Sequence, residues 1–210
     1  MKLVYIISGG PAYNRLFERF GWGVTKNIEE ASLVLFTGGE DVSPKLYGDN
    51  QHPTTFCNMT RDEAEMALFK EARSRKIPVV GICRGAQFLN VMSGGRMYQH
   101  VSAHTRDHIL IDATTDVDKE VLVSSTHHQM MMPSDNAIIL ATASEQGSRQ
   151  WFDGTTAKRD VSEEDIEVVY YPETNALCFQ PHPEMSQSHG DQYGAMARLF
   201  FKYVRNWSLT

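Results

Sequence analysis

The feature that most constrains the fold is the repeated order of short apolar segments and amphipathic stretches in the first half of the chain. Apolar segments cover residues 3–8, 31–37 and 77–82, and their lengths are typical of buried strands. Helical patterns follow at residues 14–21, 60–75 and 83–95. Gly21 is expected to end the first helix, and Thr60 with Glu63 to form a capping box at the second. Strands that alternate with helices favour right-handed crossovers and a largely parallel sheet.

The second half of the chain has a different pattern. Several short strand-like segments lie between residues 121 and 180, and residues 167–180 resemble a hairpin whose turn is 172–175. A last helix is expected over residues 192–207. Because no linker, repeat or low-complexity tract interrupts the sequence, residues 1–210 are interpreted as one α/β domain with an antiparallel extension.

Composition excludes several classes of protein. The net charge is −6 and no run of lysines and arginines occurs, so a nucleic-acid partner is not expected. No apolar stretch approaches the ~20 residues that cross a bilayer, and the N-terminal apolar run is too short for a secretory signal. The three cysteines (Cys57, Cys83 and Cys178) form no CxxC pair, which favours a reduced, cytoplasmic protein.

The pentapeptide Gly81-Ile-Cys83-Arg-Gly85 lies between the third apolar segment and a helical pattern. In such a turn a nucleophile occupies a strained position, and side chains two residues away would collide, which explains the glycines. The turn would lift the sulfur out at the C-terminal edge of the sheet, where the next helix N-terminus favours a thiolate and an oxyanion. For this pentapeptide alone, a buried structural cysteine is the alternative.

A cysteine nucleophile needs a histidine and a third group that orients it. Among eight histidines, His182 stands out because it follows a strand-like run and precedes Glu184 by two residues. Residues i and i+2 of an extended segment face the same side, so Glu184 is expected to bind one ring nitrogen while the other faces the thiol. The order nucleophile, histidine, acid differs from that of α/β-hydrolases. For this segment alone, a loop with an incidental histidine is the alternative.

Taken together, these segments resemble the class I glutamine amidotransferase superfamily, and most closely its γ-glutamyl-hydrolase branch, which includes the γ-glutamyl-γ-aminobutyrate hydrolases and is called peptidase family C26. The resemblance covers residues 32–200. It is carried by FTGGEDVSPKLYG (36–48), Arg61-Asp62, GICRGAQFLNVMSGG (81–95), Ser125-x-His127-His128-Gln129 and QPHPE (180–184).

The resemblance implies a doubly wound, flavodoxin-like α/β fold and a Cys83–His182–Glu184 triad. It implies that the backbone N–H groups of Gly39 and Arg84 form an oxyanion hole. It also places Gly38, Gln87, His128 and Gln129 along the glutamyl pocket. Glycine fits the first of these positions because a bare backbone lets an N–H group approach the oxyanion closely.

Two departures from the family pattern concern the pocket rather than the triad. The segment between the first strand and Thr37-Gly38-Gly39 is short, and Pro181 replaces the aromatic residue that is commoner before the histidine. Both bear on the side of the pocket where the leaving group would lie.

Neither a metal nor a cofactor is expected from the sequence. His100, His104 and His108 are spaced by four residues, but the segment reads as strand and loop, so a helical ligand stripe is not expected. The adjacent His127 and His128 would point to opposite faces of a strand. Residues 130–132, three methionines, are expected to form a loop that packs on the core. The glycine pairs match neither GxGxxG nor a P-loop, so no nucleotide site is indicated.

Three functions compete on the sequence alone. The first is hydrolysis of a γ-glutamyl amide through a glutamyl thioester, with a small-molecule substrate. The second is a glutaminase subunit that supplies ammonia to a separate synthase partner. The third is a non-catalytic binding module on the same fold, which the intact triad residues argue against. The oligomeric state is left open, and a homodimer is compatible with the sequence.

Overall fold

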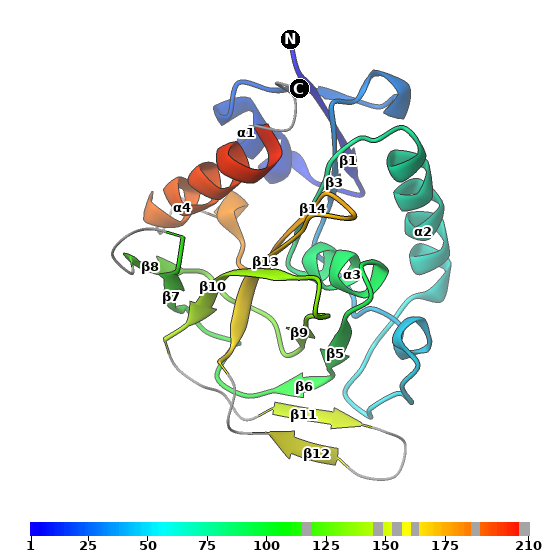
Figure 1. Ribbon diagram of the computed structural model, residues 1–210, viewed down its shortest axis with the longest axis vertical. Helices are drawn as coiled ribbons and strands as arrows, with labels where there is room; N and C mark the ends of the chain where they lie inside the picture. Colours follow the sequence, from blue (N-terminus) through cyan, green and yellow to red (C-terminus); the bar gives the residue numbers. More distant parts are fainter. Residues whose placement is uncertain (115–118, 145–148, 153–156, 161–163, 186–189, 206–210) are drawn as a thin grey trace.

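A nine-stranded sheet organises the chain in the order β2-β1-β3-β4-β14-β13-β10-β7-β8 (Figure 1). The computed structural model describes residues 1–114, 119–144, 149–152, 157–160, 164–185 and 190–205. The strands of this sheet are β1 (Leu3–Ile7), β2 (Gly23–Thr25), β3 (Leu33–Phe36), β4 (Val79–Ile82), β7 (His108–Asp112), β8 (Lys119–Val123), β10 (Ile138–Ala143), β13 (Ile166–Tyr171) and β14 (Ala176–Phe179). The first half of the chain therefore builds one side of the sheet and the second half most of the other.

The parallel part matches the predicted fold class. Strands β2, β1, β3, β4 and β14 pair in parallel, and this is the flavodoxin-like order 2-1-3-4-5. From β14 onward, β13, β10, β7 and β8 pair in antiparallel fashion. The expected antiparallel extension is thus present and continues the same sheet. The hairpin of β13 and β14 is also confirmed, with Asn175 N–H donating to Pro172 O across its turn at 3.3 Å.

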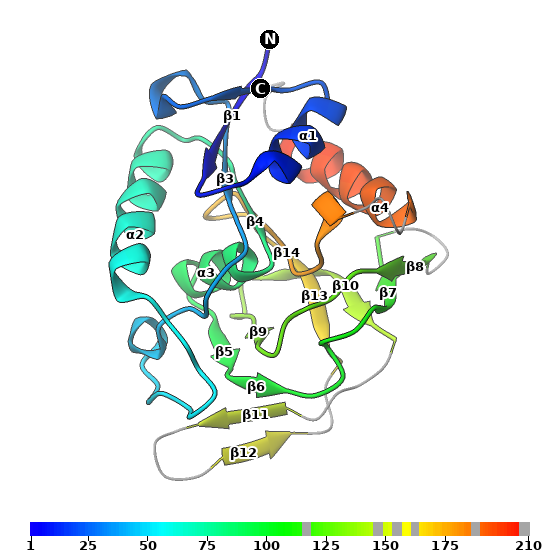
Figure 2. The ribbon, with the colours of Figure 1, turned by 180° about the vertical axis from the view of Figure 1, so that it is seen from behind.

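Helices cover both faces of the parallel part. Figures 1 and 2 show α1 (Pro11–Arg19) and α4 (Gly190–Phe200) on one side, and α2 (Met59–Ser74) and α3 (Arg84–Met92) on the other. The short helical segments are η1 (Ile28–Glu30), η2 (Pro44–Tyr47), η3 (Pro183–Met185) and the π-helical η4 (Phe201–Arg205). No helix among the described residues has the length and apolar character that a bilayer crossing requires.

Several element boundaries differ from the sequence expectation. The second helix begins at Met59, and its cap is Asn58, whose Oδ1 accepts the N–H of Arg61 at 3.2 Å. The predicted capping box of Thr60 and Glu63 is therefore wrong, because asparagine caps a helix at least as well as threonine and stands two residues earlier. The first helix begins at Pro11, whose fixed φ suits the first helical position. The last helix was expected to reach residue 207, which lies outside the described residues.

Two small sheets lie beside the main one. Strands β12 (Ala157–Asp160), β11 (Arg149–Phe152) and β6 (His100–Val101) form a three-stranded sheet at the lower end of Figure 1. Strands β5 (Arg96–Tyr98) and β9 (Met130–Met132) form a two-stranded sheet. The three methionines thus form a strand and not the predicted loop, since β5 supplies backbone partners, while Met130 and Met131 are buried as expected.

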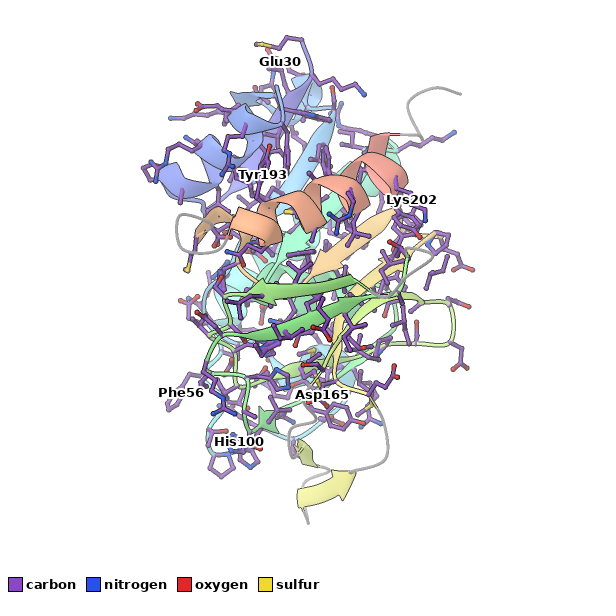
Figure 3. The ribbon with its side chains drawn as sticks, turned by 90° about the vertical axis from the view of Figure 1, so that its left-hand side faces the viewer. Glu30, Phe56, His100, Asp165, Tyr193 and Lys202 are labelled. Carbon is purple, nitrogen blue, oxygen red and sulfur yellow. The ribbon has the colours of Figure 1, made fainter. Side chains whose placement is uncertain are left out.

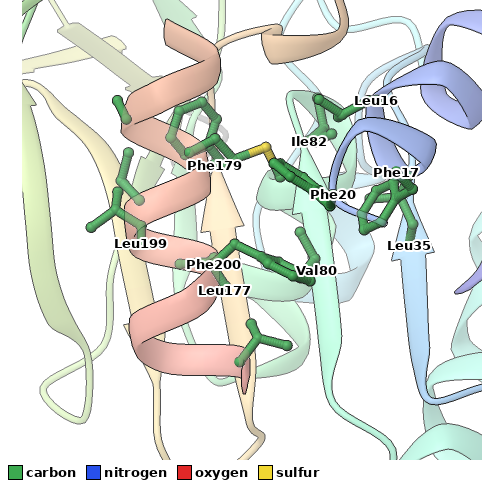
Figure 4. Packing of buried hydrophobic residues seen from close by; sticks show 14 of the residues in the cluster. Leu16, Phe17, Phe20, Leu35, Val80, Ile82, Leu177, Phe179, Leu199 and Phe200 are labelled. Atoms are coloured by element: carbon green, nitrogen blue, oxygen red, sulfur yellow. The ribbon is translucent and has the colours of Figure 1, made fainter. Parts of the chain in front are cut away.

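Two apolar layers hold the helices on the sheet. On one face, Phe17 and Phe20 of the α1 region pack against Phe200 of α4, with ring centroids 5.9 and 5.1 Å apart (Figure 4). On the other face, Phe36 of β3 stacks on Phe88 of α3 at 5.3 Å. Because both faces are covered, β3, β4 and β14 are buried along their whole lengths. The loop at the carboxyl end of β4 is therefore supported by packed strands on both sides.

The glycines flanking Cys83 are required by close backbone contacts. A Cβ atom on Gly81 would overlap the carbonyl of Gly85, and one on Gly85 would overlap the carbonyl oxygen of Phe36. Backbone atoms cannot move aside as flexible side chains do, so the close approach of α3 to β3 and β4 depends on both residues.

Gly85→Ala is predicted to lower the free energy of unfolding by about 3 kcal/mol or more, because the added methyl overpacks against a backbone carbonyl. Gly194→Ala is the control, since its Cβ would meet only the Arg198 guanidinium at 3.8 Å within α4. That variant should be neutral or stabilising. Urea denaturation of both variants checks this, and an equal effect of the two substitutions would contradict it.

Candidate active site at the carboxyl end of β4

Cys83 lies in the strained turn that the sequence predicts between β4 and α3. Its φ of 52° and ψ of −114° are conformations that residues other than glycine rarely adopt. Its backbone N–H donates to Phe179 O of β14 at 3.0 Å, which fixes the turn to the sheet. Helix α3 begins at Arg84, so the N–H groups of its first turn have no partner within the helix. The thiol thus lies at the positive end of a helix dipole.

His182 and Glu184 form a hydrogen-bonded pair, with Nδ1 of the ring 2.7 Å from Oε1 of the carboxylate. The contact was expected, but its expected cause, an extended segment, is wrong. Pro183–Met185 forms η3, and Met185 N–H donates to His182 O at 3.0 Å. The carboxylate therefore reaches the ring through a tight turn.

The charge state of His182 follows from its partners. Burial alone would lower its pKa, but hydrogen bonds with Cys83 and Glu184, and their charges, raise it to about 10. At neutral pH the ring is therefore a cation beside the thiol. This is the arrangement in which a cysteine can hold a thiolate.

Two hydroxyl groups surround the pair. Thr126 Oγ1 lies 3.0 Å from Nε2 of His182. The Tyr13 hydroxyl accepts the N–H of Gly38 at 3.1 Å. Burial, the charge of Glu184 and a hydrogen bond with it raise the pKa of Tyr13, so the phenol stays neutral. Tyr13 thus links the Gly38 turn to the carboxylate that orients the histidine.

A cavity of about 280 Å³ opens over the thiol. Its lining consists of Gly39, Glu40, Asp41, Phe56, Cys83, Arg84, Gln87, Thr126, His127, His128, Gln129 and His182. Phe56 marks the rim and projects from the surface (Figure 3). A larger cavity of about 520 Å³ borders β9 and Ile166 and shares none of the catalytic residues expected from the sequence. The smaller cavity is the candidate site, because it brings together the thiol and the imidazole.

The structure brings most of the predicted pocket residues to this cavity. Gly39, Arg84, Gln87, His128 and Gln129 line it, as expected from the sequence, whereas Gly38 is absent from the lining and donates its N–H to Tyr13. Their roles toward a substrate stay predictions.

Several of these side chains brace the cavity wall. The Gln87 side chain donates to Gln129 O at 3.2 Å. His128 Nε2 lies 3.2 Å from Oδ1 of Asp41. Residues 128–129 form a loop before β9 and not the expected strand, although His128 O accepts the N–H of Val101 at 2.8 Å.

A buried charge network connects the two predicted oxyanion positions. Glu65 of α2 accepts from Arg61 at 2.8 Å through Oε1 and pairs with Arg84 through Oε2. Arg61 also donates to Gly38 O at 3.0 Å, next to Gly39. Asp62 gives Arg84 a second carboxylate. One glutamate thus holds both the glycine turn after β3 and the first residue of α3.

Several groups of the site are not assigned a role from the sequence. Tyr13 contacts Gly38 and belongs to no pattern, and Thr126 contacts His182 from the unspecified position of Ser125-x-His127. Glu40 and Asp41 line the cavity and lie within the matching segment 36–48, but the sequence assigns them no role. Arg61-Asp62 belongs to the resemblance but has no role assigned from the sequence. Glu65 follows Arg61 by four residues on one helix face, and this spacing could have indicated that the two side chains pair.

A second group of titratable residues lies behind the cavity wall. His104, His127 and Glu167 are buried, and among the described residues they form a set whose donor atoms lie within 4.8 Å of one another. His104 and His108 come from a loop and a strand, so the helical stripe is absent as expected. Their ring centroids nevertheless lie 4.9 Å apart in the folded chain.

Comparison with protein families and known proteins gives a consistent pattern. The Peptidase C26 family model matches residues 23–184. A putative glutamine amidotransferase-like protein, YvdE of Lactococcus lactis, is 30% identical over 185 residues, covering 76% of this chain and 70% of that protein. A γ-glutamyl-γ-aminobutyrate hydrolase of Shigella flexneri is 26% identical over 190 residues, covering 83% of this chain and 71% of that protein. Protein NtpR of Enterococcus hirae is 38% identical over 80 residues, which cover 38% of this chain. The match spans only about a third of NtpR, 34% of its length.

Solved structures share the fold. A putative GMP synthase subunit from Thermoplasma acidophilum aligns with a TM-score of 0.66 at 15% identity, covering 99% of this chain and 96% of that one. PurLQS from Thermotoga maritima aligns with a TM-score of 0.65 at 16% identity, covering 98% of each chain. At these identities the likeness concerns the fold.

Glu65→Gln is predicted to lower the free energy of unfolding by about 3 kcal/mol, because it leaves the buried guanidinium of Arg84 and the partly buried one of Arg61 with one carboxylate fewer. Glu63→Gln, an exposed position on the same helix, is the control and should change stability by less than about 0.5 kcal/mol. Chemical denaturation of the two variants provides the test. Equal stabilities would show that the network contributes nothing.

Proposed function

Because the chain belongs to the peptidase C26 family, we propose that it hydrolyses the amide bond of a γ-glutamyl compound, with Cys83 as the nucleophile. The observation that carries this proposal is the buried imidazole of His182, which Glu184 orients at 2.7 Å and which the thiol and the carboxylate keep protonated. Relatives named as a γ-glutamyl-γ-aminobutyrate hydrolase and a glutamine amidotransferase-like protein support the class of bond.

The first half of the reaction forms a thioester. The Cys83 thiolate attacks the δ-carbonyl carbon of the glutamyl group, and the carbonyl electrons move to oxygen. The N–H groups of Gly39 and Arg84, which both line the cavity, donate to that oxyanion. As the C–N bond breaks, His182 gives its proton to the leaving amine. The glutamyl group then remains bound to sulfur as a thioester, and the amine leaves.

The second half releases glutamate. The now neutral His182 takes a proton from a water molecule as its oxygen attacks the thioester carbon. The C–S bond breaks, the thiolate returns, and His182 is again a cation. Glu184 holds the ring so that Nε2 faces the reacting atoms. Thr126 Oγ1, 3.0 Å from that nitrogen, gives it a hydrogen-bond partner between the two steps.

A glutaminase subunit is the second candidate function. The relatives named as putative glutamine amidotransferases and the solved neighbour named for a synthase subunit favour it. Its chemistry at Cys83 would be the same, but free glutamine would be the substrate and a synthase the partner. A cavity of about 280 Å³ has room for a glutamyl group in either case.

A substrate panel distinguishes the two functions. The purified chain alone is predicted to release glutamate from γ-glutamyl amines at least about tenfold faster than from glutamine, measured as kcat/KM by a glutamate assay. Glutamine turnover that exceeds every γ-glutamyl amine, or that appears only with a synthase, would favour the ammonia-supplying subunit.

Cys83→Ala is predicted to reduce turnover by at least about a thousandfold, because the nucleophile is lost, while the circular dichroism spectrum stays unchanged. Cys57→Ser removes another thiol, outside the cavity lining, and should keep full activity. A glutamine-analogue electrophile should label Cys83 in the unaltered chain. Retained activity in Cys83→Ala would refute the assignment, and absence of labelling would support a non-catalytic module.

Glu184→Gln is predicted to move the alkaline limb of the kcat/KM profile to lower pH by about one pH unit or more. In the unaltered chain His182 has a pKa of about 10, so the imidazolium persists up to that pH and is lost above it. Without the carboxylate charge the pKa falls and the loss begins earlier. Glu173→Gln, exposed in the hairpin turn, should leave the profile unchanged. An unmoved limb in Glu184→Gln would contradict the proposed role.

A further inference from the structure

A cluster of buried charged side chains lies in the antiparallel half of the sheet, apart from the proposed triad. His104 follows β6, His127 lies between β8 and β9, and Glu167 lies in β13. Their side chains are at most 2% exposed. Figure 3 shows Asp165, a neighbour of this cluster, in the same lower part of the molecule as His100. Three distant segments of the chain therefore direct polar groups to one interior point.

Glu167 points into this cluster because of an irregularity in the sheet. Thr142 of β10 pairs with Ile166 and the adjacent Ala141 pairs with Val168. Glu167 is therefore an extra residue on β13, which is the arrangement of a β-bulge. A bulge redirects the side chain that it carries. The strand thus departs from regular pairing at the one residue that brings a carboxylate to the histidines.

The ring nitrogens that face Glu167 lack hydrogen-bond partners. His104 Nδ1 lies 3.2 Å and His127 Nε2 lies 3.4 Å from Oε1 of Glu167, and neither contact has hydrogen-bond geometry. Both oxygens of the Glu167 carboxylate are likewise without a partner. Unpaired buried polar atoms cost free energy, so this set is incomplete as it stands.

The opposite nitrogen of each ring already has an acceptor. His104 Nε2 lies 2.7 Å from Oδ2 of Asp165, and His127 Nδ1 lies 2.7 Å from the carbonyl oxygen of Gln129. Because both acceptors require an N–H, a neutral ring at either position would turn its lone pair toward Glu167. A positive charge, either a proton or a metal ion, is then needed between the ring nitrogens and the carboxylate.

We propose that His104 Nδ1, His127 Nε2 and Glu167 bind a divalent first-row transition-metal ion of the zinc class, with a water molecule as the fourth ligand. Ligand atoms about 2.0–2.1 Å from a tetrahedral zinc ion lie about 3.3 Å from one another. The two nitrogen-to-oxygen separations of 3.2 and 3.4 Å match that edge. Two imidazoles and a carboxylate are donors that such ions prefer.

Each ligand has a second group that orients it, as is usual around protein-bound metals. Asp165 and the Gln129 carbonyl hold the two rings. His108 Nε2 lies 3.4 Å from the same oxygen of Glu167, while its Nδ1 has only a long contact of 3.4 Å to a carbonyl. His108 is therefore assigned as a group that positions the carboxylate.

The charges of the cluster agree with a cation at this point. Glu167 is fully buried. Asp165 is fully buried as well. One divalent ion would balance these two carboxylates, whereas the metal-free chain must carry protons on its imidazoles instead.

The position of His127 connects the ion to the cavity. Its neighbour Thr126 contacts His182, and the next residues, His128 and Gln129, line the cavity wall. Ser125 Oγ also donates to His104 O at 2.5 Å. A metal ion bound to His104 and His127 would thus fix the segment that supports the imidazole of His182.

The test is metal binding by the full chain, read without any activity assay. Chain stripped with a chelator is titrated with Zn²⁺ by calorimetry, and Co²⁺ is used to record the visible absorption of a tetrahedral site. The expected result is one zinc per chain with a Kd of about 1 µM or tighter, together with a higher Tm. His127→Gln and Glu167→Gln should weaken binding by at least about 100-fold.

Two control variants exclude other histidine and cysteine sites. A thiol and an imidazole can also bind zinc, so Cys83→Ala tests whether the ion lies at the triad instead. This variant should keep one zinc per chain. His52→Ala, which alters the separate stack of His52 on His100 at 5.7 Å, should keep it as well. Failure of the unaltered chain to take up zinc, or its loss in either control, would overturn the proposal. Zinc uptake is judged on the unaltered chain, so the proposal can be tested even if a ligand variant fails to fold.

Discussion

The left-handed backbone of Cys83 determines where the other groups of the site must lie. A residue other than glycine with a φ of 52° carries strain of about 1–3 kcal/mol, which the surrounding structure must offset. Here β14 binds the turn through Phe179, and glycines at positions 81 and 85 let α3 approach the backbone of β3. The result is a thiol at the carboxyl edge of a parallel sheet, where open α/β folds bind ligands.

Buried charge then holds the loops around that thiol. On one side, Glu65 connects Arg61, which binds the glycine turn after β3, to Arg84 at the start of α3. On the other side, the cluster around Glu167 holds the segment before β9. His182 lies between these supports, buried and paired with Glu184. Buried charges are costly without partners, so each network fixes the geometry of a loop that has no regular structure of its own.

Local pattern accounts for the parts of the structure that the sequence predicted well. The three buried strands, the strained cysteine turn and the hairpin of β13 and β14 all depend on residues close in the chain. The cap of α2 was misplaced because two nearby positions, Asn58 and Thr60, carry equally good capping residues. The contact of His182 with Glu184 was predicted from the right residues for the wrong backbone, since η3 and not an extended segment brings them together.

The remaining features arise from distant segments and leave no local signature. Tyr13 comes from α1 and contacts Gly38, and Thr126 comes from a loop after β8 and contacts His182. Neither spacing nor residue type marks these contacts. The histidines at 104 and 127 meet Glu167 only because β7, β10 and β13 pair in the folded sheet. The four-residue spacing of His100, His104 and His108 lies on loop and strand, as expected, and the cluster combines segments more than 60 residues apart, as Asp165 and His104 show.

Covalent catalysis by Cys83 is tested most directly by mass spectrometry of an acid-quenched reaction. A γ-glutamyl anilide is mixed with the enzyme, quenched within the first turnovers and digested for peptide mapping. A glutamyl adduct is expected on the peptide that contains Cys83, and treatment with hydroxylamine should remove it, as it removes a thioester. Turnover without any adduct on that peptide, or an adduct on Cys57 or Cys178 instead, would contradict it.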